Sequence, residues 1–133
     1  MEKKLILQLA SPPGEALWEL YEALNWNRHV KQPAAGLELA HRQAFRTAAM
    51  YDGEKLVGVG RVVSDGVIAA LLCGLGVHPG YRRRGIGRRL VGVLAAECAA
   101  AKLHLELLCE PELFDFYRRC GFEPFLAGMR LKI

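Results

Sequence analysis

The sequence predicts one α/β domain, built on a mixed, mostly antiparallel sheet with helices on both faces. Residues 45–66 show a hairpin pattern, and residues 67–77 follow as a run that is apolar on both faces. Such a run is typical of a central strand covered on each side. Amphipathic helical patterns stand before and after these strands. The 133 residues suffice for one hydrophobic core and are too few for two, so we expect a single domain over residues 1–133.

The first elements are a strand and two helices. Residues 3–10 read as the opening strand, which Pro12, Pro13 and Gly14 end. A helix is predicted over residues 15–26, where large apolar residues recur at helical spacing: Leu17, Leu20, Tyr21 and Leu24. A second, weaker helical pattern follows Pro33 and covers residues 32–45.

The hairpin and the strand after it form the centre of the predicted sheet. Two runs of β-forming residues flank a turn at Tyr51-Asp52-Gly53, and Ser64-Asp65-Gly66 ends the second run. Residues 67–77 form the next strand. Gly74 and Gly76 near its end indicate a bulge or a close backbone approach.

The remaining elements alternate between helix and strand. A helix is predicted from Ile86, a strand over residues 102–110, and a short helix over residues 111–120 that Gly121 ends. Residues 125–133 read as a last strand.

Composition excludes several classes of protein. No apolar run approaches the roughly 18 residues that a membrane span needs, and Pro12 and Pro13 interrupt the N-terminus too soon for a signal-peptide core. The four cysteines show no metal-ligand spacing, so we expect no metal site and four reduced thiols in a cytoplasmic protein: Cys73, Cys98, Cys109 and Cys120. The net charge of +4 favours anionic ligands without naming one.

Much of that charge lies in one stretch, residues 76–90, which holds five arginines and stands between the central strand and a helix. Arginines at a helix N-terminus oppose the helix dipole, so their presence suggests a compensating anion. Gly85 and Gly87 would let backbone amides approach a phosphate closely. A phosphate-binding loop, a nucleic-acid patch and a solvated basic helix start all fit the stretch at this point. The Gly-Lys-Ser/Thr of a P-loop is missing, and Leu90 stands where a dinucleotide fingerprint needs its third glycine.

Two motifs decide between these alternatives. "VHPGYRRRGIGRRL", residues 77–90, resembles motif A of the GNAT superfamily of N-acetyltransferases, with Arg82, Gly85 and Gly87 in the Arg-x-x-Gly-x-Gly places. "FYRRCGF", residues 116–122, resembles the family's downstream Phe-Tyr-x-x-x-Gly-Phe. The resemblance covers nearly the whole chain and implies a GNAT fold, whose central strands splay apart.

The resemblance also implies a binding site for acetyl-coenzyme A as co-substrate, with no metal. Backbone amides of the arginine-rich loop would hold the pyrophosphate, and Leu75 and Val77 would offer backbone groups to the pantetheine arm. The full set of expected cofactor-binding residues is Leu75, Val77, Arg82, Arg83, Arg84, Gly85, Ile86, Gly87, Arg88 and Phe116.

By the same resemblance, Tyr117 is the catalytic residue, the acid that protonates the departing thiolate; packing under the sheet is its alternative role. The general base is missing from its usual place, because Gly74 stands where many relatives carry a carboxylate. Cys73 reads as a core residue. The residues left open as bases are Glu38, His41, Asp65, Glu106 and Glu110. Solvent could also take the proton of an amine with a lowered pKa.

The expected activity is therefore acetyl transfer to a primary amine of a small molecule or peptide, by direct attack in a ternary complex. The alternatives are a coenzyme A-binding sensor without catalysis and, more remotely, a nucleic-acid-binding module. Trp18 and Trp26 either belong to the core or border the acceptor site, and Arg61 and Asp65 either contact an acceptor or form surface pairs. His78 is expected to pack the loop. A homodimer stays open, no membrane partner is expected, and the acceptor cannot be read from the sequence.

Overall fold

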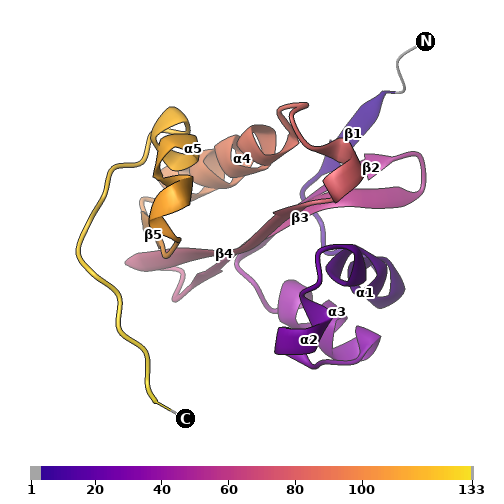
Figure 1. Cartoon of the computed structure of the whole chain (residues 1–133). Coiled ribbons are helices and arrows are strands. Elements are labelled where there is room, and N and C mark those ends of the chain that lie inside the picture. Colours follow the sequence, from indigo (N-terminus) through magenta and orange to yellow (C-terminus); the bar gives the residue numbers. More distant parts are fainter. Residues whose placement is uncertain (1–3, 133) are drawn as a thin grey trace.

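The computed structural model describes residues 4–132, which form one five-stranded sheet with helices on both faces (Figure 1). The strands are β1 (Leu5–Gln8), β2 (Arg46–Asp52), β3 (Lys55–Ser64), β4 (Ala69–Val77) and β5 (His104–Leu107). The α-helices are α1 (Gly14–Ala23), α2 (Asn27–Val30), α3 (Ala34–Arg42), α4 (Ile86–Ala100) and α5 (Phe114–Arg119), with 3-10 turns η1 (Pro79–Tyr81) and η2 (Pro111–Leu113).

The strands lie in the sheet in the order in which they occur in the chain. β1 to β4 pair antiparallel with their neighbours, and β5 joins β4 in parallel. The predicted mixed, mostly antiparallel sheet is confirmed. The parallel pair needs a crossover connection, which α4 supplies.

Each face of the sheet buries its own apolar cluster. On one face α4 packs through Ile86, Leu90 and Leu94 against strand residues such as Val57 and Val62. On the other face α1 and α3 contribute Leu17, Leu20, Tyr21 and Leu37, which pack on Ala49, Leu56 and Val59. Figure 1 shows α4 and α5 on one side of the strands and α1 to α3 on the other. Helices on both faces are therefore confirmed as well.

The two glycines near the end of β4 correspond to the two features that the sequence suggested, a bulge and a close backbone approach. The register between β3 and β4 shifts between Val59 and Arg61, and Gly74 has a φ of +58° in the left-handed region, so β4 bulges there. At Gly76 the backbone passes close to α1 and the turn after it: a Cβ would lie 2.5 Å from Trp26 Cη2. A side chain at position 76 would displace that ring.

The expectations differ from the structure at the bounds of most elements, for example at β5, which covers His104–Leu107 where residues 102–110 were expected, and at the following places. The short helix α2 was not predicted, because four residues are too few to show a period. The predicted strand over residues 125–133 is wrong for residues 125–132, which form no strand; Ile133 lies outside the described residues. A strand pattern becomes a strand only with a hydrogen-bonding partner, and within residues 4–132 this segment has none. The opening strand covers Leu5–Gln8 of the predicted 3–10, and Lys3 is not described.

Candidate functional site

The site begins where β4 and β5 part. These strands pair only from Ala69 to Leu72 on β4, opposite His104 to Leu107 on β5. Beyond Leu72 the edge of β4 that faces β5 has no partner strand among residues 4–132, while its other edge stays paired with β3 up to Val77. Leu75 and Val77 thus lie on a strand with one open backbone edge. The expected splay of the central strands is present.

The loop after β4 presents backbone amides at the start of α4. Gly85 caps the helix with a φ of +76°, and Arg83 also adopts the left-handed conformation, with a φ of +65°. No acceptor within residues 4–132 takes a hydrogen bond from any amide of residues 82–88; the first helical bond runs from the Arg89 amide to the Gly85 carbonyl. Free amides at the positive end of a 15-residue helix form an anion-binding feature.

The side chains of this loop add uncompensated positive charge. Arg82, Arg83, Arg84 and Arg88 are exposed, and the ion pairs of the described residues all involve other arginines: Arg42, Arg46 and Arg118. Arg84 lies over the ring of Tyr81, 5.0 Å from its centroid. Nothing in residues 4–132 therefore neutralises the charge of the loop.

Two contacts anchor the loop to the sheet. The Tyr81 hydroxyl donates a short hydrogen bond to the Asp52 carboxylate at the β2–β3 turn, and this bond raises the pKa of Tyr81. His78 Nδ1 accepts from the Gly80 amide at 3.0 Å, and its ring meets Tyr81 edge to face. The packing role expected of His78 agrees with this geometry. An anchored loop holds its amides in place before any ligand arrives.

Gly87 connects this loop to α5. A Cβ on Gly87 would lie 3.2 Å from Cζ of Phe116, so α4 and α5 approach each other closely at this point. Ile86, between the two glycines, is buried in the apolar cluster under α4. Phe116 and Tyr117 pack against that same cluster, as do Leu75 and Val77. The structure thus brings both sequence motifs together at the open end of β4.

Tyr117 is partly buried beside two cysteines. Its ring contacts Phe116 and Phe122 edge to face, with centroids 4.9 and 5.9 Å away. Burial raises the pKa of Tyr117, and the neighbouring Cys109 and Cys120 thiols add to the rise. A phenol in this environment keeps its proton over a wide pH range, so it remains able to donate it.

A hollow lies at the bulge of β4, on the face of the sheet that α1 to α3 cover. It has a volume of about 230 Å³ and is lined by Tyr21, Trp26, Arg61, Gly74 and neighbouring residues of α2 and α3. A Cβ on Gly74 would lie 2.6 Å from Arg61 Nη1 and 3.5 Å from the Tyr21 hydroxyl. A guanidinium and a phenol therefore occupy the space into which a carboxylate at position 74 would point.

The Tyr21 phenol is held by a buried histidine. Tyr21 Oη and His41 Nε2 lie 3.4 Å apart, and His41 Nδ1 lies 2.9 Å from the Leu37 carbonyl oxygen. His41 is 2% exposed, and burial lowers its pKa. A neutral ring that donates from Nδ1 to Leu37 can accept from Tyr21 at Nε2.

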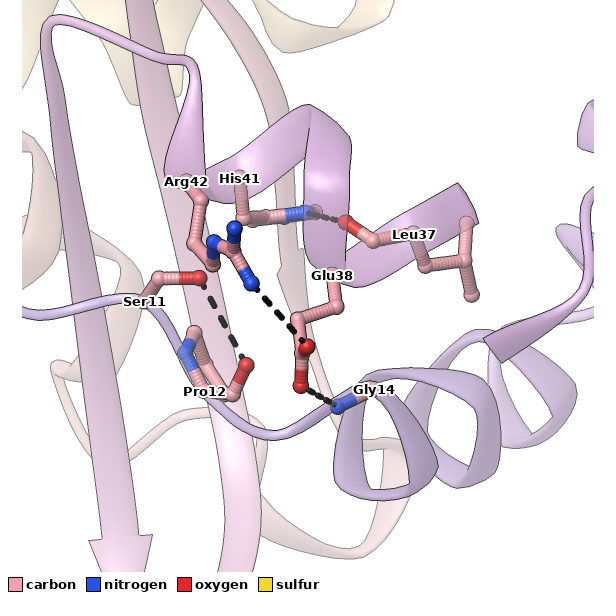
Figure 2. A network of polar contacts seen from close by, with 7 residues as sticks. All are labelled: Ser11, Pro12, Gly14, Leu37, Glu38, His41 and Arg42. Atoms are coloured by element: carbon pink, nitrogen blue, oxygen red, sulfur yellow. Dashed lines mark hydrogen bonds and ion pairs between the residues drawn. The ribbon is translucent and has the colours of Figure 1, made fainter. Parts of the chain in front are cut away.

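Most carboxylates left open as bases have structural roles or lie at the surface. Glu38 accepts from the Gly14 amide at 2.9 Å and pairs with Arg42, as Figure 2 shows. Asp65 Oδ1 accepts from the amides of Val67, Ile68 and Ala69, which closes the β3–β4 turn. Glu106 and Glu110 are exposed, on β5 and after it. None of these carboxylates lines the hollow at Gly74.

The sequence did not reveal Tyr21 as a site residue, because its helical spacing marked it only as core. Trp26 and Arg61, which were open to acceptor contact, both line the hollow, whereas Trp18 does not. Among residues 4–132, no three or more His, Cys, Asp and Glu side chains gather where they could hold a metal ion. No helix of this part of the chain has both the length and the apolar character to span a membrane.

Comparisons with known proteins converge on one family. The model of the family described as "Acetyltransferase (GNAT) domain" matches residues 43–124. Among curated proteins, one described as "Uncharacterized N-acetyltransferase ycf52", from Gracilaria tenuistipitata var. liui, is 25% identical over 80% of this chain and 59% of its own length. The histone acetyltransferase TAP1 of Glycine max is 24% identical over 86% of this chain and 53% of its own length. The chain thus spans little more than half the length of these two relatives.

Solved structures give the same result. A GNAT-family acetyltransferase from Streptococcus pneumoniae superposes with a TM-score of 0.78 at 26% identity, covering 98% of each chain. A protein from Staphylococcus aureus described as a probable acetyltransferase reaches 0.82 at 20% identity, covering 98% of this chain and all of that one. An aminoglycoside acetyltransferase from a soil metagenome, solved with sisomicin, reaches 0.77 at 17% identity and covers 97% of this chain and 96% of that one.

Proposed function

The chain belongs to the GNAT family of acetyltransferases, and on this premise we propose that it transfers an acetyl group from acetyl-coenzyme A to a primary amine. The acceptor is a small molecule or a peptide, and attack is direct, within a ternary complex. One observation carries the proposal: unpaired amides at the start of α4 lie beside the open edge of β4.

The residues of the loop fit the phosphates of coenzyme A. Amides of residues 82–88 are free to donate to the pyrophosphate, and Gly85 carries no Cβ that would stand in the way. The exposed arginines Arg82, Arg83, Arg84 and Arg88 add attraction at longer range. Backbone groups of Leu75 and Val77, on the open edge of β4, would bind the pantetheine arm, and Phe116 would bound the site beside Gly87.

Tyr117 is the proposed acid. Attack on the thioester carbonyl releases a thiolate whose conjugate acid has a pKa of about 8.5. The phenol, kept protonated by burial, donates its proton to the thiolate sulfur as the C–S bond is exchanged for a C–N bond. The attacking nitrogen loses one proton to solvent, and solvent returns a proton to the phenolate. Tyr117 and Phe116 both lie on α5, and Phe116 lies next to Gly87. One helix thus carries the proposed acid and a residue that bounds the proposed cofactor site.

The hollow at Gly74 is the proposed acceptor site. Many relatives use a carboxylate there to obtain the neutral form of the acceptor amine, and in this chain Arg61 is proposed to favour that form. A cation near an amine disfavours its ammonium form and so lowers the pKa of the amine. Arg61 Nη1 reaches the bulge, where no carboxylate lines the hollow. The acceptor then binds as the neutral amine after giving its proton to solvent. The four free thiols suit a reducing compartment, and we propose the cytoplasm.

Two measurements test the proposal. Acetyl-coenzyme A should raise the melting temperature in a dose-dependent manner, because a ligand that binds only the folded state stabilises it by mass action. Release of free thiol with a panel of amines should then reveal transfer. No thermal shift would contradict cofactor binding itself. A shift without turnover on any amine would favour the coenzyme A-binding sensor, for which the missing carboxylate at Gly74 is the supporting observation.

A further inference from the structure

The charge of the hollow at Gly74 restricts the amines that can enter it. Arg61 Nη1 reaches the bulge, and no ion pair of residues 4–132 involves this guanidinium. No Asp or Glu side chain lines the hollow. An ammonium ion would therefore meet no anionic partner there, and the one charged side chain would repel it. An amine that is already neutral at neutral pH fits this hollow better than a strongly basic one.

The walls of the hollow suit an aromatic ring. The rings of Tyr21 and Trp26 meet edge to face, with centroids 5.1 Å apart and planes at 78°. The other lining residues are mostly apolar or small: Val30, Gln32, Gly36, Leu37 and Ala40. A further ring packs well against aromatic side chains in an offset or edge-to-face arrangement. Because a cavity of about 150 Å³ is enough for benzene, the volume of about 230 Å³ accommodates one ring with a substituent.

The Tyr21 hydroxyl gives the hollow a hydrogen-bond acceptor. His41 donates from Nδ1 to the Leu37 carbonyl (Figure 2), so its Nε2, 3.4 Å from Tyr21 Oη, is free to accept the phenolic proton. Tyr21 and His41 are both buried, which keeps this pair apart from water. Tyr21 Oη lies 3.5 Å from the place of a Cβ on Gly74 and has lone pairs left for a ligand. An N–H group of the acceptor can donate to this oxygen, which leaves the nitrogen lone pair free for attack.

We propose that this hollow takes a weakly basic primary amine carried directly on an aromatic ring, and this inference rests on the proposed function. The lone pair of such a nitrogen is delocalised into the ring, so the amine is neutral at neutral pH. A lysine-like alkylamine, with a pKa of about 10.4, is an ammonium ion under the same conditions. Gly74 directly precedes Leu75, so the amine lies beside the proposed pantetheine contacts.

An amine of this class needs no base before it attacks. Its nitrogen forms the C–N bond with the thioester carbonyl as the C–S bond breaks, and one N–H proton passes to solvent. Tyr117 protonates the departing thiolate, and solvent returns a proton to the phenolate. The missing carboxylate at Gly74 thus agrees with the chemistry of the acceptor.

Four amines at neutral pH separate basicity from shape. Aniline is aromatic and neutral, benzylamine is aromatic and cationic, methoxyamine is neutral without a ring, and methylamine is cationic without a ring. Thiol release from acetyl-coenzyme A, corrected for the uncatalysed reaction, gives kcat/KM for each, and aniline should exceed the other three by about tenfold or more. Because aromatic faces also attract cations, benzylamine is the critical comparison. Any other amine in first place would overturn the inference and leave acetyl transfer standing.

Binding without turnover separates this inference from the proposed function. In the protein loaded with coenzyme A, ligand-observed NMR should show tighter binding of aniline than of benzylamine. This order without turnover of any amine would contradict acetyl transfer and support the preference of the hollow. Tighter binding of benzylamine would contradict that preference.

Two tryptophans provide a matched pair of variants. Trp26→Leu removes an aromatic wall and should lower the ratio of kcat/KM for aniline to that for methoxyamine by about tenfold. Trp18→Leu changes an exposed tryptophan of α1 that does not line the hollow, and it should keep the ratio. A ratio of two substrates measured on one sample does not depend on the fraction of folded protein. Equal ratios in the two variants would overturn the role of the aromatic wall.

Arg61→Glu tests the charge of the hollow. A carboxylate in place of the guanidinium favours the ammonium form, so the ratio of kcat/KM for aniline to that for benzylamine should fall by about tenfold or more. An unchanged ratio would show that the charge at position 61 does not select the acceptor and would overturn the inference.

Discussion

Gly85 and Gly87 stand two residues apart, yet each requires glycine for a different reason. Gly85 has open space where its Cβ would be, but its φ of +76° strains any other residue by about 1–2 kcal/mol. Gly87 has ordinary helical geometry, but its missing Cβ makes room for Phe116. The motif thus uses one glycine for the shape of the loop and the other for the approach of α5.

Gly87→Val should weaken binding of acetyl-coenzyme A by about tenfold or more, because Phe116 must move away from the loop. Arg83→Ala is the comparison: its side chain is exposed and its charge is screened, so the loss should be about fivefold or less. Isothermal titration of both variants measures the two affinities. Intact binding in Gly87→Val together with lost binding in Arg83→Ala would show that the charge of Arg83, and not the close fit between Gly87 and Phe116, decides the affinity.

Tyr117→Phe should lower kcat by roughly 10²–10⁴-fold and leave the affinity for acetyl-coenzyme A nearly unchanged, because the ring stays and only the donor is removed. Since burial raises the pKa of Tyr117, the wild-type rate should decline only at strongly alkaline pH, and this decline should vanish in the variant. Steady-state kinetics over pH provide the measurement. A change confined to KM would indicate a binding role in its place.

Arg61→Met should move the rising limb of the pH profile of kcat to higher pH by about one unit, because the ammonium form of the bound acceptor would no longer be repelled by the guanidinium. Arg42→Met removes an exposed arginine of α3 and serves as the control with an unchanged profile. If Arg61→Met kept the wild-type profile, Arg61 would have no part in the loss of the acceptor's proton.

At the scale of elements, Glu38 links α1 and α3 in addition to their apolar packing. α1 has no side-chain cap of its own, since Pro13 precedes it, and Glu38 of α3 accepts from its first amide (Figure 2). This contact between residues distant in sequence replaces the N-cap side chain, usually Ser, Thr, Asp or Asn, by which a helix start is recognised in a sequence.

Glu38→Ala should therefore lower the free energy of unfolding by about 1 kcal/mol, the usual value of a helix cap. Arg42→Ala removes the other contact of Glu38, an exposed 3.5 Å pair, and should cost only a few tenths of that amount. Urea unfolding of both variants separates the two contributions. Equal losses would mean that the stabilisation comes from the ion pair within α3 and not from the cap on α1.

Sequence patterns predicted most of these elements because each depends on neighbours along the chain. Apolar spacing identified α1, α3 and α4, and Gly74 marked the bulge. The approach of Tyr21 to Gly74 could not be predicted, since it arises from packing between residues more than fifty positions apart. The strand expected after Pro124 is absent from residues 125–132. Alternating apolar and polar residues favour a strand, but the strand forms only where another strand is available to pair with it.

At the scale of the whole molecule, the layer of α1 and α3 on one face of the sheet buries a histidine that responds to acid. His41 lies in the α1–α3 layer, and its burial lowers its pKa below the ordinary 6.5. The unfolded chain then binds a proton at a pH where the folded chain does not. The stability that this produces is complete above about pH 6.5 and is lost as the pH falls below that value.

His41→Gln should flatten the dependence of the unfolding free energy on pH between about pH 5 and pH 7, while lowering stability at neutral pH. Urea unfolding at several pH values gives the two curves. An unchanged slope in the variant would assign the dependence to other groups.

The strand order of the sheet has a consequence for how the chain folds. Because β1 to β4 neighbour each other in space as in sequence, the pairs among β2, β3 and β4 close short loops at little entropic cost. The parallel pairing of β4 with β5 joins residues more than thirty positions apart and must wait for α4. A low contact order among β2, β3 and β4 favours rapid formation of their hairpins, whereas the pairings of β1 with β2 and of β4 with β5 join distant residues and are expected to form later. The open edge of β4, where the proposed ligand would bind, therefore depends on one of the two long-range pairings that complete the sheet.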